Sequence, residues 1–211
     1  MRKKSEIIEI LDTFRQADPE PGTELEYQNP YTFLVAVVLS AQSTDKGVNK
    51  ATKTLFEIAD TPQKMLDLGI DALKQHIKTI GLYNNKAKNI MALSEILVKK
   101  YNGEIPPRRE DLEKLPGVGR KTANVVLNVI WKQPTVAVDT HVLRIASRLE
   151  LSDGKTPLEV EKDLDAVLPD NLKMYANHWL VLFGRYICKA QKPDCANCPV
   201  AAYCRCPDKR A

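Results

Sequence analysis

The sequence lacks cysteine before residue 188, lacks any long apolar run and lacks a leader-like amino terminus. The chain opens with MRKKSEIIEI, which contains neither the apolar core of a signal peptide nor a cleavage site. Its longest candidate apolar run, Phe33 to Leu39, is seven residues long. A membrane-spanning helix needs about 20 such residues. We therefore expect no membrane segment, no targeting segment and a reducing, cytoplasmic setting.

Signals for β-hairpins, low-complexity tracts and internal repeats are also missing, whereas residues that start and end helices recur along the chain. At 211 residues the chain is long enough for one domain or two small ones. Residues that favour helix N-caps precede a proline at Asn29-Pro30, Thr61-Pro62 and Thr156-Pro157. Glycines that follow apolar-periodic stretches, and so predict helix ends, are Gly69, Gly81 and Gly103. The pattern predicts an all-α fold.

Two of the predicted helices have distinct characters. Residues 84–101 place Ala87, Ile90 and Leu97 on one apolar stripe. The lysines of this segment fall mostly off the stripe and predict a basic outer face; they are Lys86, Lys88, Lys99 and Lys100. Residues 31–42, YTFLVAVVLSAQ, resemble a buried strand in composition, but the preceding Asn-Pro and the length of about three turns favour a buried helix.

Four cysteines near the carboxyl end are spaced C-x6-C-x2-C-x5-C, at Cys188, Cys195, Cys198 and Cys204. Four soft thiolates without a nearby histidine are suited to a tetrahedral zinc ion or to an iron–sulfur cluster. The wide outer gaps favour the cluster over zinc, and a reducing compartment disfavours disulfides. Cys206 is interpreted as a free thiol, although it is close enough to Cys204 to be an alternative ligand.

Charge is unevenly distributed along the chain, whose net charge is +4. Residues 71–132 hold 12 Lys and Arg against 6 Asp and Glu, and residues 186–211 hold 5 against 2. Residues 133–170 have the opposite balance, with 4 basic and 8 acidic residues. This segregation is what a face that binds a polyanion requires, although solvated helix faces also produce charge runs.

The most specific local string is LPGVGRKTANVV, residues 115–126. A short helix from Arg109 to Lys114 is expected before it, and a longer helix to about Trp131 after it. Gly117 and Gly119 allow positive φ and a sharp turn, and Val118 is expected to anchor the turn in the core. The helix dipole, the amides of the first helical turn and Arg120 all favour a bound phosphate. An ordinary glycine-capped connection between two helices is the alternative.

Together with the four cysteines, this string resembles the helix-hairpin-helix DNA glycosylases of the endonuclease III family. Further segments that look like the family are VLSAQSTDKGVNKAT at 38–52, KTIGLYNNKAKNI at 78–90, VAVDTHVLRI at 136–145 and NHWLVLFGRYIC at 177–188. The resemblance implies a [4Fe–4S] cluster on Cys188, Cys195, Cys198 and Cys204. It also implies a two-lobed fold, with a helical bundle over residues 25–135 and a cluster lobe formed by residues 1–24 and 136–211.

The same resemblance implies two catalytic residues, Lys121 and Asp139, one from each lobe and meeting in the cleft. Lys121 would attack the sugar C1′, and its place in a first helical turn, near Arg120 and partly desolvated, is expected to favour the neutral amine. Asp139 precedes a helical stretch that starts at His141, so it is also predicted to be an N-cap. A capped carboxylate stays ionised, as a group that stabilises a cationic sugar must.

Duplex DNA with damaged bases or abasic sites is the partner that the resemblance implies, bound by a monomer close to the nucleoid. Gln42 and Leu82 would fill the gap left by the extruded nucleotide. The turn Gly117, Val118, Gly119 and Arg120 would hold the phosphate backbone. Lys192, in the loop that the cluster holds, would add a phosphate contact.

The function implied is a bifunctional DNA glycosylase and abasic-site lyase acting on oxidised pyrimidines. A mismatch glycosylase of the adenine-removing type usually lacks the lysine and carries a further carboxyl-terminal domain. Lys121 and the expected end of the chain at Ala211 argue against this type. A thymine-mismatch relative is less firmly excluded. A non-enzymatic iron–sulfur DNA-binding protein would leave Lys121 and Asp139 without a role.

Overall fold

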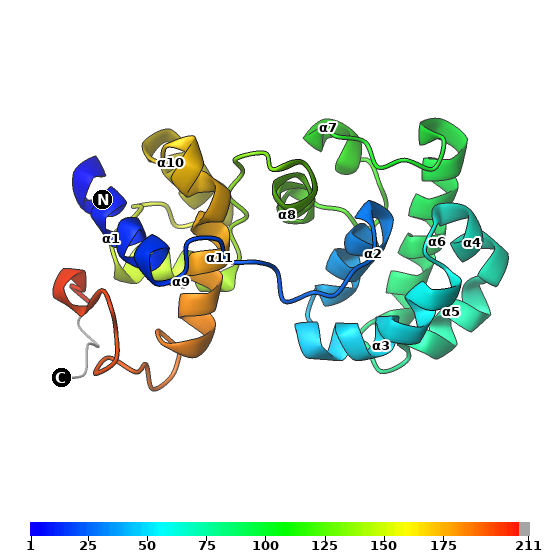
Figure 1. The fold of residues 1–211 in the computed structure, drawn as a ribbon, viewed down its shortest axis with the longest axis horizontal. Helices are drawn as coiled ribbons and strands as arrows, with labels where there is room; N and C mark the ends of the chain where they lie inside the picture. The colour runs from blue at the N-terminus through cyan, green and yellow to red at the C-terminus, as the bar shows by residue number, and fades with distance from the viewer. Residues whose placement is uncertain (207–211) are drawn as a thin grey trace. The chain divides into compact units, whose positions relative to one another are not determined.

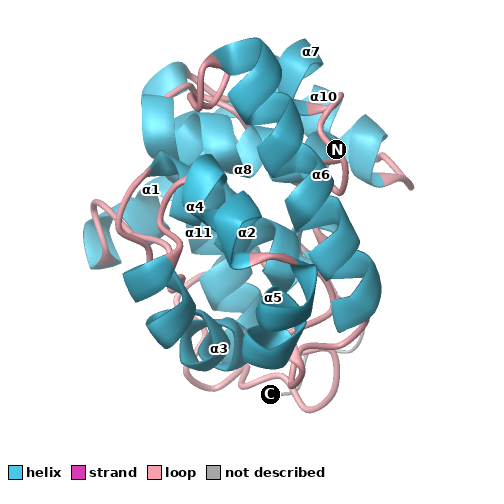
Figure 2. Cartoon of the chain, turned by 90° about the vertical axis from the view of Figure 1, so that its right-hand side faces the viewer, coloured by secondary structure: helices cyan, strands magenta, loops and turns pink. Residues whose placement is uncertain are grey.

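The computed structural model describes residues 1–206, and the regular elements among them are helices, with no β-strand (Figure 2). Contacts divide the chain into two compact units. One unit is Thr23–Trp131, and the other joins Met1–Gly22 to the residues from Lys132 onward. The all-α prediction is confirmed. In the part of the chain that is described, no helix is both long enough and apolar enough to cross a membrane. Positions 207–211, the end of the basic carboxyl-terminal segment, lie outside the described residues.

The unit Thr23–Trp131 is built around one almost wholly buried helix, α2. Its helices are α2 (Pro30–Ser40), α3 (Asp45–Ile58), α4 (Pro62–Leu68), α5 (Ile70–Ile77), α6 (Tyr83–Tyr101), α7 (Arg109–Leu112) and α8 (Arg120–Trp131) (Figure 1). Every residue of α2 from Tyr31 to Leu39 is buried, because α3, α6 and α8 all pack against it. The prediction of a buried helix rather than a strand is confirmed, and the helix ends at Ser40.

The predicted helix starts are confirmed by side-chain caps. The side chains of Asn29, Thr61 and Thr156 accept hydrogen bonds from backbone amides in the first turns of α2, α4 and α10 (Pro157–Val167), and a proline follows each cap. These caps satisfy amides that have no acceptor within the helix, while the proline removes one such amide altogether.

Two of the three predicted glycine ends are confirmed. Gly69 ends α4 with φ of +80°, and Gly103 follows α6 with φ of +82°. Gly81 was expected to end a helix in the same way, but its φ is not positive. Helix α5 instead ends at Ile77 with Lys78 as its C-cap. The left-handed residue at this connection is Leu82, just before α6.

Lys86 was predicted to belong to the basic outer face of α6, and this is wrong. The residue is only 6% exposed and lies on the buried side of the helix with Ala87 and Ile90. Its Nζ donates hydrogen bonds to the main chain at the end of α2. Burial lowers the pKa of this amine. A charged group in this position needs acceptors, and the carboxyl end of a helix supplies them because its last carbonyls have no intrahelical donor.

A second buried polar contact joins α2 to α6 at the other end of α2. The hydroxyl groups of Tyr31 and Ser94 lie 2.6 Å apart, and Ser94 Oγ also donates to the Ile90 carbonyl at 2.7 Å. Burial raises the pKa of the Tyr31 phenol, and the hydrogen bond with Ser94 acts in the opposite direction. Since the start of α2 meets the middle of α6 and its end meets the first turn of α6, the two helices run in opposite directions.

The other unit joins the first residues of the chain to its carboxyl-terminal part. Its elements are α1 (Lys4–Ala17), α9 (Thr140–Arg148), α10 (Pro157–Val167), α11 (Asp170–Tyr186) and the 3-10 helix η1 (Ala201–Tyr203). The buried Arg2 donates to the Leu149 carbonyl at 2.8 Å and to the Tyr203 carbonyl. Trp179 Nε1 donates to the Asp18 carbonyl at 2.7 Å. These long-range hydrogen bonds hold the amino-terminal residues against the carboxyl-terminal part of the same unit.

Replacing Tyr31 by Phe is expected to lower the free energy of unfolding by about 0.5–1.5 kcal/mol, since the ring stays buried and only one hydrogen bond is lost. The urea midpoint at an unchanged m value measures this loss. Tyr27→Phe is the matched control, because Tyr27 is 41% exposed. Equal midpoints for the two variants would contradict a stabilising Tyr31 to Ser94 contact.

Candidate functional site

The turn between α7 and α8 is shaped by one glycine rather than two. Gly117 has φ of +81°, and a Cβ at this position would lie 3.0 Å from the Asn89 side chain on α6. The positive φ favours glycine, and a Cβ here would also force the Asn89 side chain to shift by a few tenths of an ångström. The prediction of a second glycine with positive φ is wrong for Gly119, whose carbonyl accepts from Ala123 N at 2.9 Å as the first bond of α8.

Val118 anchors this turn in the core, as predicted. Its side chain is 5% exposed and belongs to the core of the unit Thr23–Trp131. Arg120 and Lys121 are the first two residues of α8, and both are exposed. The expected partial desolvation of Lys121 is wrong in this structure, because the residue is exposed.

Gln42 and Leu82 lie on neighbouring turns of the same unit. Gln42 follows α2 with φ of +57°, and Leu82 precedes α6 with φ of +58°. Both are exposed, Leu82 by 60%. A Cβ built on Gly81 would be 3.8 Å from the Gln42 carbonyl oxygen, so the two turns touch. A leucine in left-handed conformation with its side chain in solvent is unfavourable on both counts, and such residues cluster at functional sites.

Asp139 is an N-cap, as predicted. Its Oδ1 accepts from the backbone amides of His141 at 2.8 Å and Val142 at 2.9 Å, in the first turn of α9. The residues before it, Val136–Val138, are buried, and Asp139 itself is half-buried. One carboxylate oxygen thus satisfies two amides that have no acceptor within α9.

The other end of α9 holds the first residues after α11. Arg148 Nη1 donates to Cys188 Sγ at 3.3 Å and to the Lys189 carbonyl at 2.7 Å. Arg144 Nη2 donates to the Gly184 carbonyl at 2.8 Å. These contacts were not predicted from the sequence, where Arg144 and Arg148 appear only as the two arginines of a segment with helical periodicity.

The four predicted cysteine ligands line one small cavity. Cys188, Cys195, Cys198 and Cys204 surround it together with apolar side chains that include Leu149 and Phe183. Cys206 does not line it, which separates the leftover cysteine from the predicted set. Within residues 1–206, no three His, Cys, Asp or Glu side chains are placed to hold a single metal ion.

The chemistry of this cavity fits an iron–sulfur cluster. It offers four soft donors, an apolar wall and the Arg148 hydrogen bond to one sulfur. Burial, followed by the nearby thiols, raises the pKa of Cys198, whereas the amide of Val200 lowers it. A bound cationic centre reverses this balance because it binds the thiolate.

Lys192 lies in the loop between the first two cysteines. It is exposed and has φ of +50°. The loop is fixed at both ends, because Arg148 donates to the Lys189 and Ala190 carbonyls and the amide of Asp194 donates to the Ile187 carbonyl at 3.0 Å.

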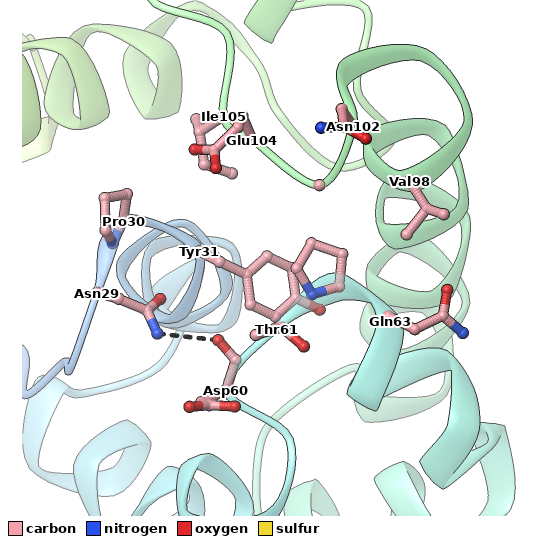
Figure 3. Close-up of a pocket in the computed structure, with 12 residues that line it drawn as sticks. Asn29, Pro30, Tyr31, Asp60, Thr61, Gln63, Val98, Asn102, Glu104 and Ile105 are labelled. Carbon is pink, nitrogen blue, oxygen red and sulfur yellow. Dashed lines mark hydrogen bonds between the residues drawn. The ribbon is translucent and has the colours of Figure 1, made fainter.

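A larger cavity, of about 490 Å³, lies elsewhere in the unit Thr23–Trp131 (Figure 3). It is lined from the start of α2, the start of α4 and the end of α6, and Asn29 Nδ2 donates across it to the Asp60 carbonyl at 2.9 Å. Gln42 and Leu82 lie at the opposite ends of α2 and α6. None of the predicted site residues lines this cavity, and we assign no role to it.

Family models match most of the chain. Residues 35–170 match the HhH-GPD superfamily base excision DNA repair protein, and residues 188–204 match the iron-sulfur binding domain of endonuclease III. The second match spans the four cysteines of the small cavity and ends before Cys206.

Curated proteins and solved structures agree with the family models. The endonuclease III of Haemophilus influenzae is 52% identical over 206 residues, and that of Escherichia coli strain K12 is 49% identical over 206 residues, with 98% of each chain covered in both cases. A trapped endonuclease III–DNA covalent intermediate matches with a TM-score of 0.92 and 48% identity over 97% of each chain. A non-covalent endonuclease III–DNA complex matches with a TM-score of 0.92 and 47% identity over 97% of this chain and 96% of the other.

These matches extend over the glycine turn, the α9 cap and the cysteine cavity alike. The chain therefore belongs to the endonuclease III family of HhH-GPD base excision DNA repair glycosylases, and its cofactor is a [4Fe–4S] cluster.

Proposed function

We propose that the chain is a bifunctional glycosylase and abasic-site lyase that removes oxidised pyrimidines from duplex DNA and cleaves the strand 3′ to the resulting site. The observation that carries the proposal is Lys121, an exposed amine in the first turn of α8, directly after the Gly117 turn. Further support comes from the similar solved structure of an endonuclease III trapped as a covalent intermediate with DNA.

Lys121 acts as the nucleophile. Its neutral Nζ attacks C1′, the bond from C1′ to the base breaks, and the base leaves with the electron pair and takes up a proton. The sugar ring then opens to a Schiff base as O4′ gains a proton. Loss of a proton from C2′ expels the 3′ phosphate, and hydrolysis of the imine restores the amine.

Asp139 supplies the negative charge for this reaction. The sugar becomes cationic as the base departs, and the Asp139 carboxylate, which two backbone amides hold in place, stabilises that charge. The same carboxylate can accept the proton that Lys121 must lose before it attacks.

The Gly117 turn binds the phosphate backbone through the amino end of α8. Arg120 is exposed beside that end, and helix amino ends attract anions through their dipole and their amides. We propose that Lys192 makes a further phosphate contact from the cluster loop, and that the enzyme acts as a monomer.

Gln42 and Leu82 enter the duplex when the damaged nucleotide leaves it. The leucine fills the unstacked step, and the amide of the glutamine can pair with the base left without a partner. Their exposure and the contact between their two turns support a joint role.

We assign the cluster to Cys188, Cys195, Cys198 and Cys204. Its contribution is structural, because metal–thiolate bonds hold a segment with few large apolar residues. That segment carries Lys192, and Arg148 orients its first cysteine.

A mismatch glycosylase is the second candidate. A thermostable thymine-DNA glycosylase matches with a TM-score of 0.81 at 22% identity, which supports a common fold alone. Lys121 argues against the adenine-removing type.

Replacing Lys121 by Gln should abolish both strand cleavage and borohydride trapping on abasic duplex DNA while leaving binding nearly unchanged, because the nucleophile is removed and the turn is kept. Gel assays of cleavage, trapping and binding measure all three. Lys99→Gln is the control, since Lys99 is an exposed lysine paired with Glu95. A wild-type protein that binds abasic DNA and is never trapped would sink the Schiff-base mechanism.

Replacing Asp139 by Asn should lower kcat by about 10²–10⁴-fold with little loss of stability, because Asn caps a helix as well as Asp but carries no charge. Asp139→Ala should lose activity and also about 1 kcal/mol of stability. Single-turnover base release and thermal unfolding separate the two effects. Full activity in Asp139→Asn would restrict this residue to its capping role.

Replacing Cys198 by Ser should remove iron, sulfide and the broad visible absorption, and should lower the thermal stability of the cluster-binding unit. Cys206→Ser is the matched control and should keep all three, because Cys206 does not line the cavity. Metal analysis of the purified variants decides the assignment, and loss of iron from Cys206→Ser alone would reverse it.

A further inference from the structure

Lys86 is a buried cation whose side-chain hydrogen bonds all go to one short segment. Its Nζ donates to the Leu39 carbonyl at 2.9 Å, to the Ala41 carbonyl at 2.6 Å and to Ser43 Oγ at 3.2 Å. An ammonium group has three donors, and three acceptors are present. These acceptors lie on both sides of Gln42.

The segment around Gln42 needs such a partner. Helix α2 ends there without a glycine, and Gln42 takes the left-handed conformation that glycine usually supplies. The last carbonyls of the helix carry partial negative charge, so a cation at this end stabilises them. Lys86 therefore closes the end of α2 from a different helix.

The main chain of Lys86 reaches the second residue proposed to enter DNA. Its backbone amide donates to the Leu82 carbonyl at 3.1 Å, in the first turn of α6. One residue thus contacts Leu82 through its backbone and brackets Gln42 through its side chain. Both of these neighbours are exposed and left-handed.

We propose that Lys86 is a positioning residue that holds Gln42 and Leu82 together, ready to enter the duplex as the damaged nucleotide leaves it. The inference rests on the proposed function in giving that role to Gln42 and Leu82. Holding the two strained turns in place before binding removes an ordering cost that the protein would otherwise meet on the DNA. Lys86 itself touches neither the sugar nor the base.

A purely structural role for Lys86 makes a different prediction. The Tyr31 to Ser94 contact joins the same two helices at the opposite end of α2 and is also buried. If burial and helix packing were the whole purpose of Lys86, losing either contact would have the same effect on DNA processing at equal loss of stability.

The test compares Lys86→Met, which keeps an apolar stem and removes the donors, with Tyr31→Phe as the matched control. On duplex DNA containing an oxidised pyrimidine, Lys86→Met should lose about 10 to 100-fold in kcat/KM. The fluorescence of 2-aminopurine beside the lesion, which reports unstacking, should fall in parallel. Tyr31→Phe should change neither. Similar losses in both variants at matched stability would overturn the proposal.

Two further measurements keep the outcome clear. Borohydride trapping on single-stranded abasic DNA needs no insertion, so Lys86→Met should trap as the wild type does. A wild type that fails to trap would instead count against the proposed function. On a Gln42→Ala, Leu82→Ala background, Lys86→Met should cost little more, because the residue acts through those two. If the loss of kcat/KM from Lys86→Met simply added to that of the double variant, Lys86 would not act through Gln42 and Leu82.

Ser43→Ala supplies a milder variant should Lys86→Met fold poorly. It removes only the longest of the three hydrogen bonds, at 3.2 Å, and leaves the lysine in place. A smaller loss of unstacking in the same direction is expected, with unchanged trapping on single-stranded abasic DNA. Wild-type unstacking in Ser43→Ala together with normal duplex activity in Lys86→Gln, which has no charge and one donor fewer, would overturn the assignment.

Discussion

The backbone groups that lack partners at helix ends are the constraint on which this structure depends. An α-helix leaves amides at its start and carbonyls at its end without intrahelical partners. Each residue with a proposed role outside the cluster loop lies at such an end. Lys121 is in the first turn of α8, Asp139 caps α9, Leu82 precedes α6 and Gln42 follows α2. A protein built almost wholly of helices therefore presents its chemistry at connections.

The connections differ in how their unpaired groups are satisfied. Asp139 satisfies two amides in the first turn of α9 with its own carboxylate. The end of α2 takes its donors from Lys86, a residue 45 positions away in sequence from Ala41. At the start of α8, Arg120 and Lys121 are exposed, and the proposed ligand of this helix end is a DNA phosphate.

The cluster segment is held in place differently from the helices, because it has almost no core of its own. Val200 is fully buried, but most residues between Cys188 and Cys204 are not. Arg148 from α9 and Arg2 from the amino terminus hold its two ends by hydrogen bonds to main-chain carbonyls. Metal–thiolate bonds complete what the apolar contacts of so short a segment cannot supply.

Local pattern alone determined the all-α class, the capped starts at Asn29, Thr61 and Thr156, and the cap at Asp139, because these depend on a few adjacent residues. Resemblance supplied the remaining roles. Only the tertiary structure showed that Gly117 has a positive φ and faces the Asn89 side chain of another helix, whereas Gly119 begins α8 without a positive φ. Lys86, which the sequence placed on a solvated helix face, is buried at the end of α2 in the structure. Periodicity assigns a lysine to the surface because burying a charge is costly, and the acceptors that offset this cost lie on a helix that local sequence does not bring near.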